Sequence, residues 1–348
     1  MNTVEQKEKY PSLDIAKFLC SIFILLYHFF SEIGSLPPII DEALSLYAVC
    51  VALFMVISGF LMWNRVEKEN DEKKQFGIVR KQVLRILQIY LIWSVPYLIY
   101  SISRWNFESI TIGFVLWKIQ GWIFGSTFYT IWFMPSLAIG LILSFFVIKK
   151  CPSWIAIVLC VLFYVVGGLN STYSFLISKK AWYGNVNWFI KIWLNGERGG
   201  LFYAFPLVSV GYLIACLKTK FKPLIMAFLS FVAMIALLVE ALVLREIAGH
   251  TGIDLTLTMP IVIFCVMGFL VSVPIKDFAL SIWMRNMSTL IFMSQRLFLT
   301  VLPGLFVSVK SLYEKQLVAF LIVCIGTIVF SSVVILLAKK IRCLRKIF

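Results

Sequence analysis

The sequence predicts an all-α polytopic membrane protein with about ten transmembrane helices and both termini in the cytoplasm. Composition gives the first indication: 61% of the 348 residues are hydrophobic, 14% are charged, and the mean hydropathy is +0.94. The second is the recurrence of apolar stretches of roughly 20 residues, the length at which a helix crosses a bilayer. A water-soluble enzyme is excluded because its core could not bury so much apolar side chain, and disorder is excluded by the abundance of aromatic residues.

The predicted spans follow one another along the whole chain with short polar connections. We expect one transmembrane domain over residues 1–348 and no separate soluble domain. The spans are residues 13–30, 46–63, 86–103, 131–148, 153–170, 200–217, 223–243, 256–273, 287–306 and 316–338.

The basic residues are unevenly divided between the two sides of the predicted membrane. Of the 32 Lys and Arg residues, 21 fall in segments on the N-terminal side, 10 are counted with the opposite side, including Arg296 within the span 287–306, and Lys17 falls within the first span. Cytoplasmic loops collect Lys and Arg, so the N-terminal side is expected to be cytoplasmic. The same bias accounts for the net charge of +15, and no nucleic-acid partner is expected.

Two of the outer connections, residues 104–130 and 171–199, are long and rich in Trp and Asn. One interpretation is an aromatic belt at the membrane interface. The other is a binding surface for a polar, ring-shaped ligand such as a carbohydrate, which packs well on flat aromatic groups flanked by amides. The sequence leaves both interpretations open.

The first predicted helix carries the ionisable residues that most clearly suggest chemistry within the membrane. Lys17 and His28 are eleven residues apart, so at about 100° per residue both project from one helix face, roughly 16 Å apart along the axis. Asp14 lies three residues before Lys17 and is expected to pair with it. Ionisable groups in a span are costly and are usually functional or paired. The alternative is that Lys17 reaches the inner surface while His28 bonds to a neighbouring helix.

No metal site is expected from the sequence. The only other histidine, His250, is expected in a solvated outer turn, and neither histidine belongs to a zinc-binding motif. The eight cysteines lack metal or redox spacing and are expected to be structural thiols.

Six short segments, taken in order, resemble the motifs of one family of membrane proteins. The first is a Leu-Asp pair, a basic residue and, after ten residues, His, which are here Leu13, Asp14, Lys17 and His28. The others are Phe54–Leu61 with Arg65, Arg80–Leu87, Ile131–Met134, Arg198–Tyr212 and Ser288–Phe292. From residue 12 to about residue 300, the chain therefore resembles the acyltransferase-3 family of integral membrane acyltransferases.

The chain also departs from the pattern of that family. Lys17 stands where many relatives have Arg, which keeps the charge but loses the bidentate fork. Thr130 and Gln295 stand where the family often has His, and Gln82 replaces the first Arg of an Arg-x-x-Arg motif. His28 is then the one histidine within a predicted span.

The resemblance implies that an acyl group, usually acetyl from cytoplasmic acetyl-CoA, is transferred to a hydroxyl of an extracytoplasmic glycan or cell-envelope acceptor. His28 would be the general base. Lys17 would orient the donor or neutralise developing charge, and the candidate catalytic residues are His28, Lys17 and Asp14. The candidate donor-binding residues are Arg65, Arg80, Lys81 and Arg85. The candidate acceptor-binding residues are Ser58, Trp132, Glu197, Arg198 and Gln295.

The fold alone does not determine the function, and two other interpretations remain. The membrane portion of vancomycin-resistance serine racemases resembles the same family and is linked to serine uptake, which favours a small-molecule transporter or permease. A non-catalytic partner in polysaccharide export is the third interpretation. The expected location is the bacterial plasma (inner) membrane as a multi-pass protein. The expected partners are the lipid bilayer and a glycan or lipid-linked sugar, with a second copy of the chain as a further candidate.

Overall fold

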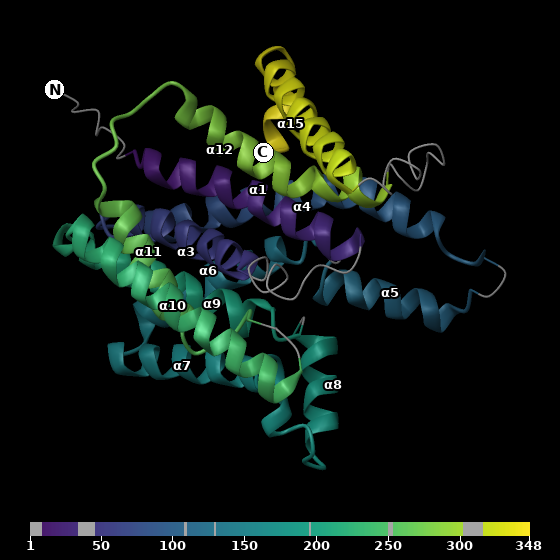
Figure 1. The fold of residues 1–348 in the computed structure, drawn as a ribbon, viewed down its shortest axis with the longest axis horizontal. Coiled ribbons are helices and arrows are strands. Elements are labelled where there is room, and N and C mark those ends of the chain that lie inside the picture. The colour runs from purple at the N-terminus through teal and green to yellow at the C-terminus, as the bar shows by residue number, and fades with distance from the viewer. Residues whose placement is uncertain are drawn as a thin grey trace.

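The computed structural model describes residues 9–33, 46–107, 110–128, 130–194, 196–249, 253–301 and 316–348. His250 lies outside the described residues. Most of the long helices run in nearly the same direction across the molecule, whereas α8 and α15 lie steeply to them (Figure 1). We call the end of this bundle that holds the start of α1 the inner end, and the opposite end the outer end.

Eight described helices are long and apolar enough to cross a membrane. They include α1 (Pro11–Ile33), α3 (Tyr47–Val66), α4 (Glu72–Ser103), α6 (Phe133–Lys150), α7 (Ser153–Asn170), α9 (Phe205–Leu217) with the π-helix η3 (Gly200–Ala204) before it, α10 (Pro223–Ala248) and α15 (Gln316–Lys340). The predicted spans 256–273 and 287–306 correspond to the shorter helices α11 (Met259–Ser272) and α12 (Leu280–Arg296). The prediction of an all-α polytopic membrane protein is confirmed.

Helix α4 begins earlier than the sequence predicts. The segment before residue 86 was expected to be a basic loop, but it is the first part of a 32-residue helix. Asp71 explains the difference, because its side chain accepts hydrogen bonds from the main-chain N–H groups of Lys73 at 2.8 Å and Lys74 at 3.4 Å. These bonds satisfy N–H groups that would otherwise lack partners at the helix start. The basic residues of this segment therefore lie on a helix.

Helices α3 and α9 form a close contact at the centre of the bundle. A Cβ atom at Gly59 would lie 2.6 Å from the main-chain oxygen of Val208, and one at Gly211 would lie 2.5 Å from the main-chain nitrogen of Phe60. Glycine at both positions lets the two backbones approach, which is how helices commonly associate in membranes. The buried face of α3 also contacts α1 and α4, so this helix is the centre on which the bundle packs.

The two long outer connections contain helices, α5 (Ile112–Phe124) and α8 (Tyr183–Trp193). Their tryptophans divide into two groups. The exposed group suits an interfacial belt and consists of Trp117, Trp182, Trp188 and Trp193. Trp105 and Trp122 instead stack on each other with ring centroids 6.0 Å apart. The exposed tryptophans therefore suit the interfacial belt, and the interpretation as a carbohydrate-binding surface stays a prediction.

Candidate functional site

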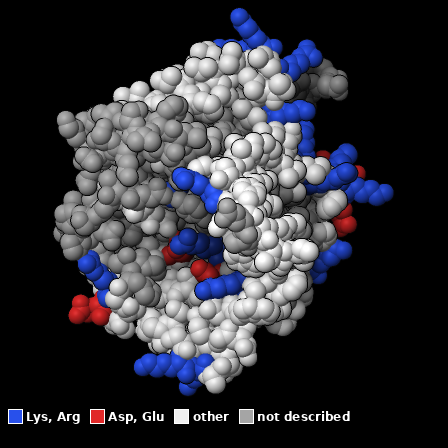
Figure 2. Space-filling model, turned by 90° about the vertical axis from the view of Figure 1, so that its right-hand side faces the viewer, with Lys and Arg blue, Asp and Glu red and all other residues white. Residues whose placement is uncertain are grey.

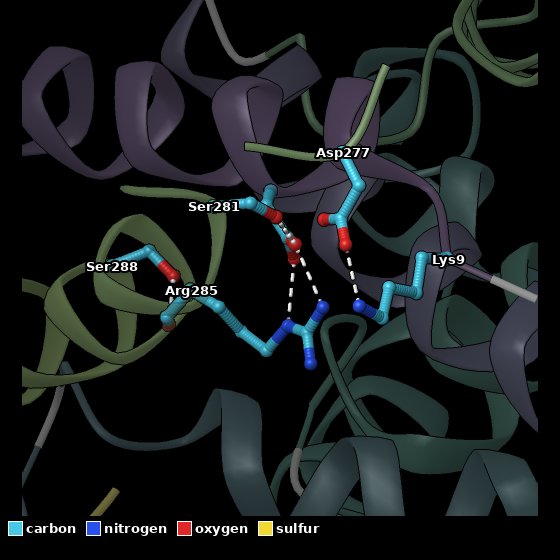
Figure 3. Close-up of polar contacts among 6 residues, drawn as sticks. Lys9, Asp277, Ser281, Arg285 and Ser288 are labelled. Carbon is cyan, nitrogen blue, oxygen red and sulfur yellow. Dashed lines mark hydrogen bonds and ion pairs between the residues drawn. The ribbon is translucent and has the colours of Figure 1, made fainter. Parts of the chain in front are cut away.

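Polar residues gather at both ends of the helix pair α1 and α12. At the inner end, Asp14 of α1 accepts bonds from Arg285 of α12, at 2.8 Å from Nε and 2.7 Å from Nη2. Ser281, one helical turn earlier on α12, donates a third bond to Asp14 at 2.6 Å (Figure 3). Asp14 is buried, so this forked pair fixes the two helices together and neutralises the carboxylate. Asp14 thus forms its hydrogen bonds with α12, and its expected pairing with Lys17 is limited to an electrostatic interaction.

Three more cations lie around this pair. Arg85 and Arg285 are close enough to interact electrostatically with each other. Each of them also interacts with Lys17 and with Arg65. Lys17 lies over the ring of Phe54, 5.8 Å from its centroid. We call Asp14, Lys17, Arg65, Arg85 and Arg285 the inner cluster. It places four cations around one carboxylate, an arrangement that suits a ligand with several negative charges.

Three further predicted residues are not part of the inner cluster: Arg80 and Lys81, predicted to bind the donor, and Ser58, predicted to bind the acceptor. Arg80 and Lys81 are exposed on α4, one turn or more before Arg85. Ser58 lies on α3, where its main-chain oxygen accepts a bond from Nε2 of Gln82 at 3.0 Å. Its hydroxyl donates to the main-chain oxygen of Phe54 at 2.8 Å. Ser58 therefore belongs to the contact between α3 and α4.

At the outer end, His28 meets a residue that the sequence analysis did not select. Nδ1 of His28 lies 2.9 Å from Nη2 of Arg296, the last residue of α12. An arginine can only donate, so Nδ1 accepts and the neutral imidazole carries its proton on Nε2. Tyr27 stacks on Tyr47 beside this pair, with ring centroids 3.6 Å apart. The contact gives His28 a fixed tautomer and orientation.

A second ion pair lies close to His28. Arg198 bonds Asp254, which is buried, and Arg198 also interacts electrostatically with His28. The Asp254 carboxylate raises the pKa of Arg198 further above its ordinary value. The guanidinium lies over the ring of Trp132 at 5.9 Å, and Glu197 adds a weaker electrostatic interaction. We call His28, Arg296, Arg198, Asp254 and Trp132 the outer cluster.

The backbone around the outer cluster is irregular. The π-helix Gly200–Ala204 begins two residues after Arg198, and a second π-helix, η5 (Leu297–Val301), follows Arg296 directly. π-Helical turns are rare and frequently occur at functional sites. Figure 2 shows this end of the molecule, where basic and acidic side chains meet in a depression near the middle of a largely uncharged face.

Glu240 of α10 positions the segment that carries Asp254. Its carboxylate accepts bonds from the main-chain N–H groups of Leu257 at 2.9 Å and Thr258 at 3.0 Å. The hydroxyls of Tyr173 and Thr258 donate to it as well. Burial, together with the bond to Glu240, raises the pKa of Tyr173 above its ordinary value. These bonds hold the start of α11, and with it Asp254, in place.

Aromatic residues separate the two clusters. The rings of Phe54, Phe133 and Phe292 are in mutual contact, with centroids 5.4 to 6.1 Å apart. Phe292 lies between Arg285 and Arg296 along α12, so this group lies at an intermediate depth. The polar track that the spacing of Lys17 and His28 suggested is therefore interrupted by an apolar layer.

Gln295 lies next to the apolar layer on α12. Its side chain is completely buried, and Nε2 donates to the main-chain oxygen of Phe292 at 3.1 Å. Its Oε1 is buried without a hydrogen-bond partner in the part of the chain that the structure describes. Buried polar atoms are rarely left in this state, so Gln295 could accept a bond from a ligand.

The structure also shows what the sequence analysis missed. Arg285 and Arg296 had been counted among charges at the two membrane surfaces, but both lie on α12 and bond to residues of α1. Their spacing of eleven residues equals that of Lys17 and His28 and was the available signal. Asp254 gave no signal, because it follows an ordinary polar turn.

Comparison with known proteins identifies the family. Residues 10–336 match the model of the acyltransferase-3 family, which is described as an acyltransferase domain. The match covers most of the chain, so this protein belongs to that family, as the sequence motifs predicted. Together with its apolar helices, this makes it a multi-pass membrane protein of an acyltransferase family.

The curated relatives that match are racemases. An amino-acid racemase from Enterococcus faecalis is 21% identical over 97% of this chain and 47% of the racemase. A serine/alanine racemase from Enterococcus gallinarum is 23% identical over 64% of this chain and 31% of that protein. The chain thus spans at most about half the length of these relatives. No solved structure matches.

Proposed function

We propose that this member of the acyltransferase-3 family transfers an acetyl group across a bacterial plasma membrane, from cytoplasmic acetyl-CoA to a hydroxyl of a glycan or cell-envelope acceptor outside. One observation carries the proposal. The same two helices hold a cationic cluster at one end and an oriented, neutral histidine at the other. Membrane transfer of an acyl group needs both an anion-binding donor side and a proton acceptor on the acceptor side.

The inner cluster would hold the donor. CoA carries several phosphate charges, and the cluster offers an excess of cations around one neutralised carboxylate. Arg285 has a side chain that is 45% exposed, so its guanidinium is accessible while two of its nitrogens bond Asp14. Arginine suits this task because its planar fork matches phosphate oxygens. Lys17, deeper along α1, would neutralise charge nearer the thioester.

The apolar layer would surround the extended thiol arm of the donor. Phe54, Phe133 and Phe292 offer ring faces and no hydrogen-bonding groups, and an acetyl thioester is largely apolar. Their rings would have to part to let the arm reach the outer cluster. Excluding water at this level would protect the thioester from hydrolysis.

At the outer cluster, the acceptor hydroxyl would replace Arg296 at Nδ1 of His28. The oxygen of the acceptor hydroxyl attacks the thioester carbonyl carbon, and the hydroxyl proton passes to Nδ1 of His28. The carbon–sulfur bond then breaks. His28 then gives the proton to the departing thiolate, which restores the neutral imidazole and leaves free CoA. The displaced guanidinium of Arg296 lies next to the developing oxyanion and stabilises it. Trp132 and Arg198 would hold the acceptor sugar.

The test combines purified protein with cells. Protein in nanodiscs should release free CoA thiol from acetyl-CoA when an acceptor is added, and surface glycans from cells with the gene should be heavier by one acetyl group per site. Lys149→Gln, which removes an inner-side cation that pairs with Glu67 outside the clusters, is the matched control and should stay active. Unchanged glycan masses together with no CoA release would reject the proposal.

A transporter is the second candidate, because the sequence resembles the membrane portion of serine racemases, and this chain matches an amino-acid racemase over 97% of its own length and 47% of that protein. In this alternative, the outer cluster would bind the charged ends of an amino acid, with Arg198 facing the carboxylate. Proteoliposomes that take up L-serine through the protein, without any CoA release, would support the transporter and reject acyl transfer.

A further inference from the structure

A separate cavity lies beside the outer cluster, between the end of α4 and α5. Its volume is about 480 Å3, which falls within the roughly 300–1,000 Å3 of small-molecule sites. Tyr100 and Arg104 line it from the end of α4, Phe114 and Lys118 from α5, and Trp105 and Phe128 from the connections. Neither the inner nor the outer cluster contributes a residue to its lining.

The charged side chains that line this cavity, among the described residues, are both positive. Arg104 and Lys118 are its charged lining residues, and neither forms an ion pair within the described ranges. Each cation rests on aromatic rings instead. Arg104 lies 5.5 Å from the ring centroid of Tyr100, and Lys118 lies 5.5 Å from that of Phe114. Two cations held at one cavity, with no carboxylate among its described lining residues, favour an anionic ligand.

The aromatic residues of the cavity form a rigid wall. Trp105 stacks on Trp122 with an interplanar angle of 16° and meets the ring of Phe114 edge-on at 5.2 Å. The indole Nε1 of Trp105 is buried and has no hydrogen-bond partner among the described residues. A ligand oxygen would satisfy this donor, and Ser101, which also lines the cavity, carries a hydroxyl that can donate as well.

A short series of contacts runs from the cavity to α12. Phe128 stacks on Tyr97 with centroids 4.7 Å apart, and the Tyr97 hydroxyl donates to the main-chain oxygen of Met293 at 2.5 Å. Met293 lies on α12, three residues before Arg296. Phe128 also lies four residues before Trp132 in the chain. The cavity is therefore near the end of α12 that carries Arg296, on the side where the acceptor is proposed to bind.

We propose that this cavity binds an anionic sugar, a ring that carries a phosphate or carboxylate group, as a second subsite for the acceptor. The proposal rests on the proposed function and deepens it, because it gives the acceptor a charge. Arg104 and Lys118 would bind the anion, the indole N–H of Trp105 would bond a ring substituent, and the faces of Tyr100 and Phe114 would pack on the ring. A phospholipid headgroup shares the anion but lacks the ring.

Binding is measured on the full chain in nanodiscs of phosphatidylcholine by isothermal titration calorimetry. The probes are glucose 6-phosphate, glucuronate, glucose and inorganic phosphate. We expect the two charged sugars to bind, glucose to bind at least tenfold more weakly, and added salt to weaken the charged sugars. Inorganic phosphate should bind more weakly than glucose 6-phosphate, because it makes no ring contact. Equal affinity for the two phosphates would overturn the sugar assignment.

Three variants locate the site. Combined Arg104→Gln and Lys118→Gln should lower the affinity for glucose 6-phosphate by roughly 100-fold or more, given about 10-fold or more per charged hydrogen bond. Trp105→Phe, which keeps a ring and loses the N–H group, should lower it several-fold. Combined Lys179→Gln and Lys180→Gln removes the same charge from an exposed outer connection and should change nothing. Equal losses in the control pair would mean that net charge alone attracts the probe.

The remaining outcomes separate this proposal from its rivals. If nanodiscs that contain phosphatidylglycerol abolish sugar binding in the wild type, and that effect disappears in the Arg104 and Lys118 variant, the cavity is a lipid-headgroup site and the proposal fails. His28→Ala should leave the binding of glucose 6-phosphate unchanged while abolishing transfer. Sugar binding without any acyl transfer in the wild type would instead reject the proposed function and leave this site standing.

Discussion

The two polar clusters use arginine in opposite ways. At the inner end, Arg285 keeps 45% of its side chain exposed and pairs with a buried carboxylate, and further cations lie around it. At the outer end, Arg296 is only 3% exposed and meets a neutral imidazole. The inner cluster thus has four cations around one carboxylate, whereas the outer cluster holds a buried arginine against an oriented imidazole, beside the Arg198–Asp254 pair.

This difference separates binding from chemistry. Accessible cations attract a soluble anion over a distance but orient it weakly, because solvent and salt screen them. Buried, hydrogen-bonded groups hold a fixed geometry and act strongly on charge that develops beside them. Changes at the outer end should therefore act on the rate of transfer, and changes at the inner end on donor affinity or on stability.

The largest effect is expected from His28, which tests the outer end most directly. His28→Ala should lower the rate of acyl transfer by about 10²–10⁴-fold, the usual contribution of a positioned acid–base group. His28→Gln should be equally inactive, because an amide can bond Arg296 but cannot accept a proton near neutral pH. Acetyl-CoA affinity should change little in both variants, as measured by calorimetry.

The glutamine variant distinguishes catalysis from structure. If His28 only anchors α1 to α12 through Arg296, glutamine should restore transfer and alanine should not. Transfer by His28→Gln at close to the wild-type rate would remove His28 as the base, and it would turn the outer cluster into a structural contact.

The second effect concerns stability at the inner end. Arg285→Gln leaves the buried carboxylate of Asp14 with Ser281 as its remaining hydrogen-bond partner among the described residues, and we expect a loss of about 2–3 kcal/mol, less than the ~3–5 kcal/mol of a fully buried pair. Asp14→Asn removes the buried charge together with the pair and should cost about 1 kcal/mol. In detergent, Arg285→Gln should therefore unfold at a lower temperature than Asp14→Asn. The reverse order would show that Asp14 does not depend on Arg285.

The third effect tests the scaffold between the clusters. Gly59→Ala would place a Cβ atom 2.6 Å from the main-chain oxygen of Val208, so α3 and α9 must separate, at a cost of about 1–3 kcal/mol. Gly77→Ala is the matched control, since a Cβ there meets nothing within 4 Å on a helix, and it should stabilise by about 0.5–1 kcal/mol. Similar unfolding temperatures for the two variants would contradict the close contact.

The fold was predictable from the sequence to a larger extent than the site. Apolar runs of bilayer length identify helices because lipid leaves the backbone no other way to satisfy its polar groups. The start of α4 was missed because the hydropathy of its first turns is that of a loop, whereas the Asp71 cap that fixes it is a single residue. α5 and α8 were missed for the related reason that they are too short to be read as spans.

The site was predictable only within single helices. The rotation per residue placed Lys17 and His28 on one face, but it could not place α12 beside α1. Arg296 therefore stayed unrecognised although it contacts His28, and Arg198 could be selected from a motif while its partner Asp254 could not. Contacts between distant segments depend on packing, which one sequence without relatives does not reveal.

The smallest effect separates cations that belong to the inner cluster from those beside it. Both Arg80 and Arg85 are exposed on α4, but Arg85 interacts with Lys17, Arg65 and Arg285, and its Nη2 donates to the main-chain oxygen of Phe348 at 3.3 Å, whereas Arg80 lies outside the cluster.

Arg85→Ala should weaken acetyl-CoA binding by about tenfold, as the loss of one charge-assisted contact to a phosphate would. The difference in acetyl-CoA affinity between Arg85→Ala and the wild type should become smaller as the salt concentration is raised, because salt screens the contact in the wild type that the variant lacks. Arg80→Ala, the matched control one turn earlier on the same helix, should change the affinity less than twofold, because an exposed cation outside the cluster gains little from a bound phosphate. Calorimetry on both variants at low and high salt measures this. Equal losses of affinity for Arg80→Ala and Arg85→Ala would mean that the whole basic face of α4, rather than the inner cluster, attracts the donor. The inner cluster would then not be a specific binding site, and the contrast between the two ends would no longer hold.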